Sequence, residues 1–154
     1  MINLLIMVTT SMAEDSGPIA GTWSANGTKE LLPFEDGREV SLFKVSGLVK
    51  LQDAVGSSKD YWSQCFGLTD SSTGAEARCT WKSLDGQKIF LTLHSKPFAE
   101  GSHVNGEIIG GTGAVEGITG SIQFDWETMT FQKGSKATAV GGFSKDLTGT
   151  YQIP

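Results

Sequence analysis

Residues 121–131 read Ser-Ile-Gln-Phe-Asp-Trp-Glu-Thr-Met-Thr-Phe, and apolar and polar side chains alternate along most of this stretch. One face of an extended chain would hold Ile122, Phe124 and Trp126, opposite a polar face. Successive side chains of a β-strand point to opposite faces of the sheet, so this period of two predicts a strand with one buried face. The preceding glycines mark the turn from which this strand starts.

Similar strand signals recur about every 10 to 15 residues between turns, whereas helix signals are scarce. The pair Asp85-Gly86 predicts a hairpin turn. Gly27 is expected to end the first strand, and Gly47 to permit a bend in the second. The expected strands are residues 19–26, 39–52, 61–68, 75–83, 88–94, 104–109, 121–131, 136–143 and 148–153.

These strands predict an all-β fold, a single closed antiparallel barrel of about eight strands. The sequence offers no amphipathic helix long enough to cover an open sheet, and closing the barrel removes exposed strand edges. A barrel of this size is either filled with side chains or holds one small ligand. The sequence therefore permits an interior pocket without specifying one.

The composition is that of a folded globular protein. The chain has 154 residues, with 20 glycines, 38% hydrophobic residues and 19% charged residues. This excludes a disordered polar chain and favours one domain with its own core. The net charge of −5 and the lack of a basic run argue against nucleic-acid binding, because affinity for the phosphate backbone comes mainly from Lys and Arg.

Residues 1–13 are similar to the end of a secretory signal peptide. An apolar run at residues 2–8 is followed by small residues at Ser11 and Ala13, as at a cleavage site. No Lys or Arg precedes the run, so the true start could lie upstream, and a buried N-terminal strand is the alternative. We expect a mature barrel domain at residues 14–154, without a transmembrane segment, that is periplasmic or secreted.

Two cysteines, Cys65 and Cys79, flank a turn-rich stretch and could face each other across antiparallel strands. In an exported protein this arrangement predicts a disulfide, with two buried thiols as the alternative. Closing a loop of this size would stabilise the fold by roughly 3 kcal/mol. Together with His94 and His103 the cysteines match no zinc-ligand spacing, so no metal is expected.

Residues 110–120 read Gly-Gly-Thr-Gly-Ala-Val-Glu-Gly-Ile-Thr-Gly. A phosphate-binding loop would need a Lys-Ser/Thr pair or a helix N-terminus after it, and a strand follows here instead. We therefore expect a structural turn, in which glycine permits positive φ and close backbone approach. The glycines of this turn are Gly110, Gly111, Gly113, Gly117 and Gly120.

This glycine-rich turn and the strand after it resemble the signature of the allene oxide cyclase and dirigent-like β-barrel superfamily. A block before it resembles small exported bacterial proteins of unknown function, and reads Cys-Phe-Gly-Leu-Thr-Asp (65–70), Arg-Cys-Thr-Trp (78–81) and Asp-Gly (85–86). The resemblance covers about residues 61–131. It implies an eight-stranded barrel with an apolar interior, as in relatives that bind or cyclise hydrophobic molecules. Val115 departs from the signature, because these families usually have an aromatic residue there.

Candidate catalytic groups are few. Asn26 lies on the first expected strand, but the acidic residue that accompanies such an asparagine in the cyclases is absent. Glu107 could point into the barrel, although sequence does not fix its direction. His94, Asp125 and Glu127 are expected to face solvent, and no motif implies a cofactor. The candidates for a ligand-binding wall are Trp23, Trp62, Trp81 and Phe90, with core packing as the alternative for the tryptophans.

Three functions fit these observations. The first is an exported, non-catalytic barrel that binds a small hydrophobic molecule. The second is an isomerase or cyclase that holds an apolar substrate in a folded conformation and needs no cofactor. The third is an interaction protein whose barrel forms a homo-oligomer through an apolar exterior strip.

Overall fold

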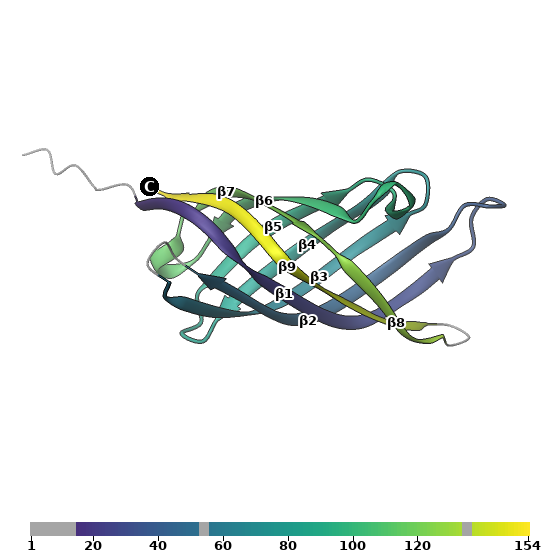
Figure 1. The fold of residues 1–154 in the computed structure, drawn as a ribbon, viewed down its shortest axis with the longest axis horizontal. Helices are drawn as coiled ribbons and strands as arrows, with labels where there is room; N and C mark the ends of the chain where they lie inside the picture. Colours follow the sequence, from purple (N-terminus) through teal and green to yellow (C-terminus); the bar gives the residue numbers. More distant parts are fainter. Residues whose placement is uncertain (1–14, 53–55, 134–136) are drawn as a thin grey trace, which may run out of the picture.

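The computed structural model describes residues 15–52, 56–133 and 137–154, which form an antiparallel β-barrel (Figure 1). The strands of this part of the chain are β1 (Asp15–Leu32), β2 (Val40–Gln52), β3 (Ser58–Asp70), β4 (Gly74–Ser83), β5 (Lys88–Ser95), β6 (His103–Gly111), β7 (Thr119–Asp125), β8 (Glu127–Lys133) and β9 (Thr138–Ile153). Two 3₁₀ turns, η1 (Phe98–Glu100) and η2 (Gly113–Val115), complete the elements. The all-β prediction is confirmed.

Closure of the barrel comes from β9. Strands β1 to β7 pair antiparallel in chain order, and β9 pairs with β7 on one side and with β1 on the other. Eight strands thus form the ring, as predicted, and β8 is an additional strand that pairs with the first half of β9. In Figure 1, β8 continues beyond the end of β7 toward one end of the barrel.

The strand predicted for residues 121–131 is interrupted at Trp126, which separates β7 from β8. The backbone N–H of Trp126 donates to the carbonyl of Ser102 at 2.9 Å, outside the ladder with β9. The indole of Trp126 packs against Phe124 and Trp23, with ring centroids 6.2 and 6.0 Å apart. The alternation that predicted one strand is therefore kept on both sides of a local break.

Two other predicted boundaries are wrong. Gly27 does not end the first strand, because β1 continues to Leu32. A Cβ at Gly27 would lie 1.9 Å from the carbonyl oxygen of Lys44 on β2, so glycine here permits close approach of the two strands. The two strands predicted near the C-terminus form one strand, because β9 stays paired with β1 through a register shift between Gly21 and Trp23.

The core lies inside the barrel, where alternate side chains of each strand meet. On β5, for example, Ile89, Leu91 and Leu93 are buried, whereas Lys88 and His94 are exposed. The largest fully buried side chains include Trp81, Leu91, Leu147 and Val49. Burial of this apolar surface is the main contribution that stabilises the fold.

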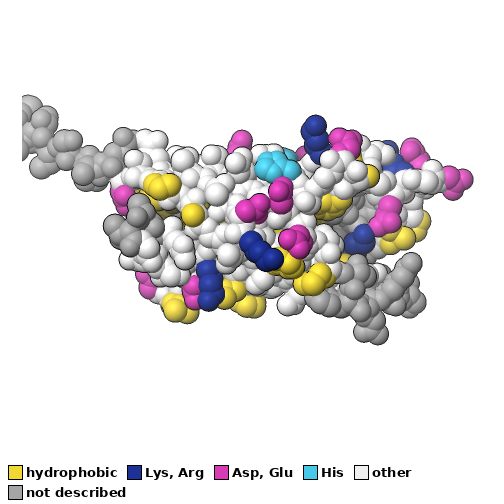
Figure 2. All heavy atoms as spheres, in the orientation of Figure 1, with side chains coloured by type: hydrophobic (Ala, Val, Ile, Leu, Met, Phe, Trp, Pro, Cys, Tyr) yellow, Lys and Arg dark blue, Asp and Glu magenta, His cyan; other side chains and the backbone are white. Residues whose placement is uncertain are grey.

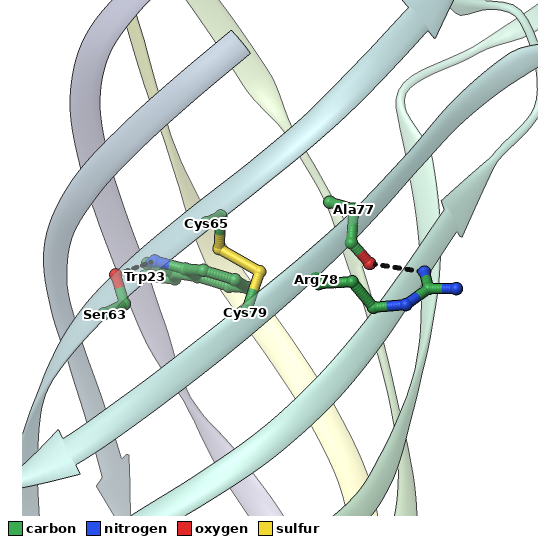
Figure 3. The surroundings of a disulfide bond; sticks show 6 residues. All are labelled: Trp23, Ser63, Cys65, Ala77, Arg78 and Cys79. Atoms are coloured by element: carbon green, nitrogen blue, oxygen red, sulfur yellow. Dashed lines mark hydrogen bonds between the residues drawn. A yellow bond between two sulfur atoms is a disulfide. The ribbon is translucent and has the colours of Figure 1, made fainter. Parts of the chain in front are cut away.

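The predicted disulfide between Cys65 and Cys79 is confirmed (Figure 3). The two residues are direct partners across β3 and β4, with a Cα–Cα distance of 4.2 Å. This short separation is typical of a pair without mutual backbone hydrogen bonds, where facing side chains are closest. Both cysteines are buried, so the disulfide is part of the interior wall.

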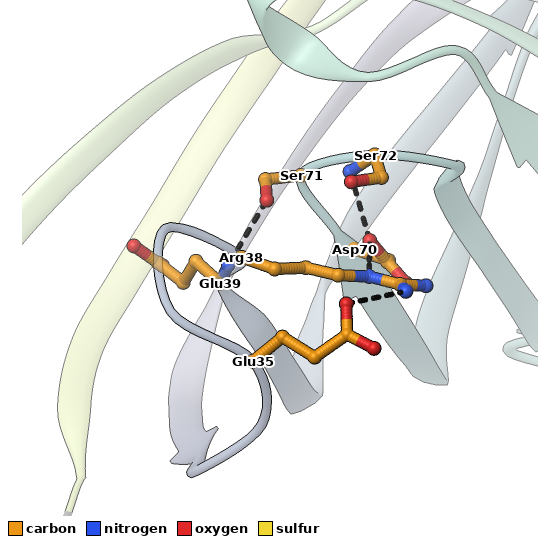
Figure 4. Close-up of polar contacts among 6 residues, drawn as sticks. All are labelled: Glu35, Arg38, Glu39, Asp70, Ser71 and Ser72. Atoms are coloured by element: carbon orange, nitrogen blue, oxygen red, sulfur yellow. Dashed lines mark hydrogen bonds and ion pairs between the residues drawn. The ribbon is translucent and has the colours of Figure 1, made fainter.

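An ion pair connects two loops at one end of the barrel (Figure 4). Arg38, just before β2, donates to both carboxylate oxygens of Asp70 at the end of β3, with distances of 2.6 to 3.2 Å. Asp70 also accepts from the backbone N–H of Ser72 at 2.8 Å. These bonds hold the pKa of Asp70 well below its usual range, the bond from Arg38 being the larger cause.

The predicted signal peptide at residues 1–13 lies outside the described residues. Within the described ranges, no helix has the length and hydrophobicity needed to span a bilayer.

Candidate functional site

Two tryptophans pack against each other in the interior, Trp23 from β1 and Trp81 from β4. Their ring centroids are 5.4 Å apart in an edge-to-face arrangement, at 89°. The indole N–H of Trp23 donates to the Ser63 hydroxyl at 2.9 Å (Figure 3). Trp23 lines one cavity and Trp81 lines another, and the two cavities share no lining residue. The tryptophan pair therefore separates two cavities within one barrel.

The first cavity has a volume of about 200 Å³. It lies at the end of the barrel where β3 turns into β4, since Thr69, Ala75 and Ser95 contribute to its lining. Its wall is mainly aromatic and aliphatic, and includes Trp23, Phe43, Val45, Leu93, Phe124 and Trp126. A dry apolar cavity of about 150 Å³ already accommodates benzene, so this one has room for a small apolar molecule.

The polar groups of the first cavity include the hydroxyls of Thr69, Ser95 and Thr128, and three titratable side chains. The Ser95 hydroxyl is buried and has no hydrogen-bond partner among the described residues. Three titratable side chains, Lys29, Glu76 and His94, contribute to the lining but are 33%, 69% and 51% exposed. His94 Nδ1 lies 3.8 Å from a Glu76 carboxylate oxygen. The arrangement offers an apolar wall, the buried Ser95 hydroxyl, a Thr69 hydroxyl that is hydrogen-bonded to Ser41, and a solvated charged rim.

The second cavity, of about 430 Å³, lies at the opposite end, where β1 begins and β9 ends. Its wall combines aliphatic side chains with Tyr61, Trp81 and Tyr151. The Tyr151 hydroxyl donates to Asp15 at 3.3 Å. Burial raises the pKa of the Tyr61 phenol, and the nearby Asp85 and Tyr151 raise it further. Tyr61 is therefore a protonated donor at neutral pH.

The predicted wall residues divide into two groups. Trp23 and Trp81 are 3% and 0% exposed and line the two cavities. Trp62 is 53% exposed on the outer surface, because it alternates with the inward Tyr61 and Ser63. Phe90 is half-buried between the inward Ile89 and Leu91, and lines neither of these two cavities.

The predicted catalytic candidates Asn26 and Glu107 both lie on the outer surface. Asn26 follows the buried Ala25 on β1, and Glu107 stands between the buried Gly106 and Ile108 on β6. Alternation therefore directs both side chains away from the interior, and neither lines either cavity. The expectation that one of them is the buried polar group of a pocket does not fit this placement.

Sequence reasoning missed Tyr61 and Ser95. A signal for Tyr61 was present, because it is four residues before Cys65 and thus on the same strand face as the predicted disulfide. The same rule places Trp81 on the face of Cys79 and Trp62 on the opposite face. Alternation gave a signal for Ser95 too, because it is two residues after the inward Leu93, but the predicted strand ended at residue 94.

The glycine-rich turn between β6 and β7 contains η2. Gly113 and Gly117 have φ of 66° and 77°, in the left-handed region that favours glycine. Val115 of this turn, the position that departs from the superfamily signature, lines the second cavity. A valine here leaves more of the cavity open than an aromatic side chain would.

Outside the cavities, the surface carries scattered charges. His103 Nδ1 lies 3.0 Å from Asp125, and both side chains are more than half exposed. On the face shown in Figure 2, acidic, basic and apolar side chains are interspersed. Within the described residues, no group of three or more His, Cys, Asp or Glu side chains is placed to hold a metal ion.

Fold and interior together define a small closed β-barrel protein with a cavity on each side of a tryptophan pair. No protein-family model and no curated protein sequence matches the chain. Among solved structures, a pterocarpan synthase dirigent protein is similar, with 12% sequence identity and a TM-score of 0.44 over 95% of this chain and 90% of that one.

Proposed function

We propose that the protein is an exported β-barrel that binds a small hydrophobic molecule in the first cavity. The observation that supports this most directly is the wall of aromatic rings, from Trp23, Phe43, Phe124 and Trp126, around about 200 Å³ of space. Small-molecule binding sites usually have an apolar wall with a few polar groups. An apolar ligand would gain from leaving water without burying any charge.

Export is supported by two independent features. The buried Cys65–Cys79 disulfide is of a kind that persists in oxidising compartments and is rare in the reducing cytosol. The apolar N-terminal run with its small residues predicts a signal peptide. We therefore place the protein in the periplasm or outside the cell.

Binding can be tested with fluorobenzene, an apolar probe observed by ¹⁹F NMR. Val45 and Val115 are half-buried valines that line the first and second cavity respectively, so V45F and V115F form a matched pair of cavity-filling variants. We expect saturable binding that V45F weakens by roughly tenfold or more and V115F leaves unchanged. Absence of saturable binding, or loss in V115F alone, contradicts a ligand in the first cavity.

An isomerase or cyclase is a second candidate, and it is favoured by the Ser95 hydroxyl, which is buried and has no hydrogen-bond partner in the part of the chain that the structure describes. The Ser95 hydroxyl could orient a polar group of a substrate that the apolar wall holds folded, so that positioning accelerates the reaction. The test is conversion of a compound recovered with the protein from its host. The expected result is turnover that Ser95→Ala reduces while binding of the compound persists. Unchanged turnover in S95A rejects Ser95 as the orienting group.

Self-association is a third candidate, because β2 and β3 expose apolar side chains on the outer surface. Leu42, Trp62, Phe66 and Leu68 are 38% to 55% exposed, and Leu42 and Leu68 are cross-strand partners. A second copy packed on this strip would bury them. Light scattering is expected to show a multimer that the L42S/F66S variant dissociates, and a wild-type monomer contradicts the candidate.

A further inference from the structure

The apolar strip on the outer surface of β2 and β3 is bordered by cations. Its exposed members are Leu42, Trp62, Phe66 and Leu68. The register of the sheet places Phe66 directly between Lys44 of β2 and Arg78 of β4. Trp62 is the cross-strand partner of Lys82. The Lys44 ammonium lies 5.3 Å from the centre of the Phe66 ring, so cation and apolar surface are in contact here.

The charge of this face is opposite to that of the whole chain, whose net charge is −5. The outer faces of β2 to β5 carry five exposed cations, which are Lys44, Lys50, Arg78, Lys82 and Lys88. The acidic residues of these faces, among the described residues, are Asp60, Glu76 and Asp70, and the last is paired with Arg38. None of the five cations forms an ion pair with a described residue. The face therefore has a positive charge that this part of the chain does not neutralise.

Two of these cations face each other. Lys82 and Lys88 are direct cross-strand partners on β4 and β5. Like charges directly opposite each other are unfavourable, and an anionic partner lying against both would remove this repulsion. At the other end of the strip, Glu30 is the cross-strand partner of Leu42, and Glu76 is that of Leu68. The basic part of the strip is thus the part around Trp62 and Phe66.

The combination of exposed apolar and basic side chains limits the kind of partner that fits. A second copy related by two-fold symmetry would bring two basic borders together, which is unfavourable. A soluble polyanion would neutralise the cations but leave the apolar side chains in water. The surface of an anionic lipid bilayer provides for both, because its headgroups attract Lys and Arg and its interfacial layer accommodates aromatic side chains.

We infer that the apolar strip is a docking surface for an anionic lipid bilayer, with Trp62 and Phe66 at the level of the headgroups and the five cations against the lipid phosphates. This gives the strip an occupant different from the second copy considered above. The residues of the strip and its cations line neither cavity, so the inference does not rest on ligand binding.

The test is co-sedimentation with vesicles of phosphatidylcholine alone and of an equimolar mixture of phosphatidylcholine and phosphatidylglycerol. We expect binding to the mixed vesicles that added salt weakens, and little binding to phosphatidylcholine. W62S/F66S should weaken binding to the mixed vesicles by roughly tenfold or more, because two apolar side chains are lost. The matched control is I109S/M129S, which removes two exposed apolar side chains outside the strip and should bind as the wild type does.

Charge reversal tests the basic border separately. Lys82→Glu places opposite charges across β4 and β5, so urea unfolding should show no loss of stability. The same variant should bind the mixed vesicles roughly fivefold or more weakly, given a contribution of about 1 kcal/mol for each cation at such a surface. Lys145→Glu makes the same change on β9 and should have little effect. Equal weakening by both variants would mean that only net charge matters, and would overturn the inference.

Trp62 also supplies a spectroscopic signal at the docking surface. Mixed vesicles should shift the tryptophan emission of the wild type to shorter wavelength, and W62F should lose most of this shift while it still binds. Equal binding to both kinds of vesicle, or binding to neither, overturns the inference. So does a lipid-free multimer that W62S/F66S dissociates, because a second copy then covers the strip. Fluorobenzene binding should be unchanged in W62S/F66S, so failure here leaves the proposed function standing.

Discussion

At the scale of single residues, the two central tryptophans differ in how their indole nitrogens are satisfied. Trp23 has a buried acceptor in Ser63, which is itself fully buried. We predict that Ser63→Ala lowers the free energy of unfolding by about 1–3 kcal/mol, because it leaves the Trp23 N–H unpaired. Urea unfolding measures this change.

The matched control is Ser24→Ala, since Ser24 is the exposed neighbour of Trp23 on the same strand. It should change stability by less than about 0.5 kcal/mol. In the W23F background the indole N–H is absent, so the added effect of S63A should be smaller than in the wild type. Equal effects of S63A in both backgrounds would show that the hydrogen bond contributes nothing.

Residue-level expectations depended on knowing which face of each strand is inside. Once Cys65 and Cys79 are taken as interior partners, alternation places Trp81 inside and Trp62 outside. Asn26 and Glu107 had no such reference on their own strands, so their outward direction required the structure.

At the scale of elements, close approach of β1 and β2 requires glycine at Gly47. A Cβ there would lie 1.9 Å from the carbonyl oxygen of Ser24 on β1. The backbone of β1 cannot move aside as easily as a flexible side chain would. We therefore predict that Gly47→Ala lowers the free energy of unfolding by about 1–3 kcal/mol or more. Thermal or urea unfolding tests this, with Ser46→Ala as the control, because position 46 already has a Cβ. A stability of G47A equal to that of S46A contradicts the prediction.

Sequence periodicity identified most strands, but not where they join or break. The predicted end at Gly27 failed because glycine also serves close strand approach, and single-sequence patterns do not separate that role from strand termination. The break at Trp126 was hidden for a related reason, since the alternation of side chains continues across it. Both features depend on segments distant in the sequence, the neighbouring strand β2 for Gly27 and the residue before β6, Ser102, for Trp126.

The ion pair between Arg38 and Asp70 links the β1–β2 loop to the β3–β4 turn and predicts a pH dependence. The folded-state pKa of Asp70 is depressed, so the unfolded state binds this proton more readily. The stabilisation is therefore fully present above the ordinary aspartate pKa of about 3.9 and is lost as pH falls through the lower folded-state value.

We predict that Arg38→Met lowers the unfolding temperature at neutral pH, and that its difference from the wild type shrinks as the pH is lowered below about 4. Differential scanning calorimetry across this range measures the difference. Lys29→Met, which removes the more exposed pair with Glu39, should have a smaller effect at neutral pH. A difference for R38M that is constant with pH would rule out Asp70 as its source.

At the scale of the whole molecule, the closed barrel could be predicted and its interior could not. Strand number follows from turn spacing, whereas cavity volume depends on shear, register and which large side chains meet at one level. The pairing of Trp23 with Trp81, from strands far apart in the sequence, determines that the space is divided in two. No local pattern in either strand contains that information.

A single mass spectrum of the protein purified from its own host can report the start of the chain, the state of the cysteines and any bound small molecule. Non-reducing native mass spectrometry should show a chain that begins near residue 14, lacks two hydrogens because Cys65 and Cys79 are bonded, and retains a small apolar adduct. The adduct is expected because an apolar ligand that leaves the cavity exposes its apolar surface to water again, which is unfavourable. A chain that retains Met1 with two free thiols would contradict export, since an oxidising compartment is what sustains the disulfide. An oxidised, processed chain without an adduct would agree with export but not with ligand binding. It would favour the apolar strip on the outer surface of β2 and β3 as the functional surface.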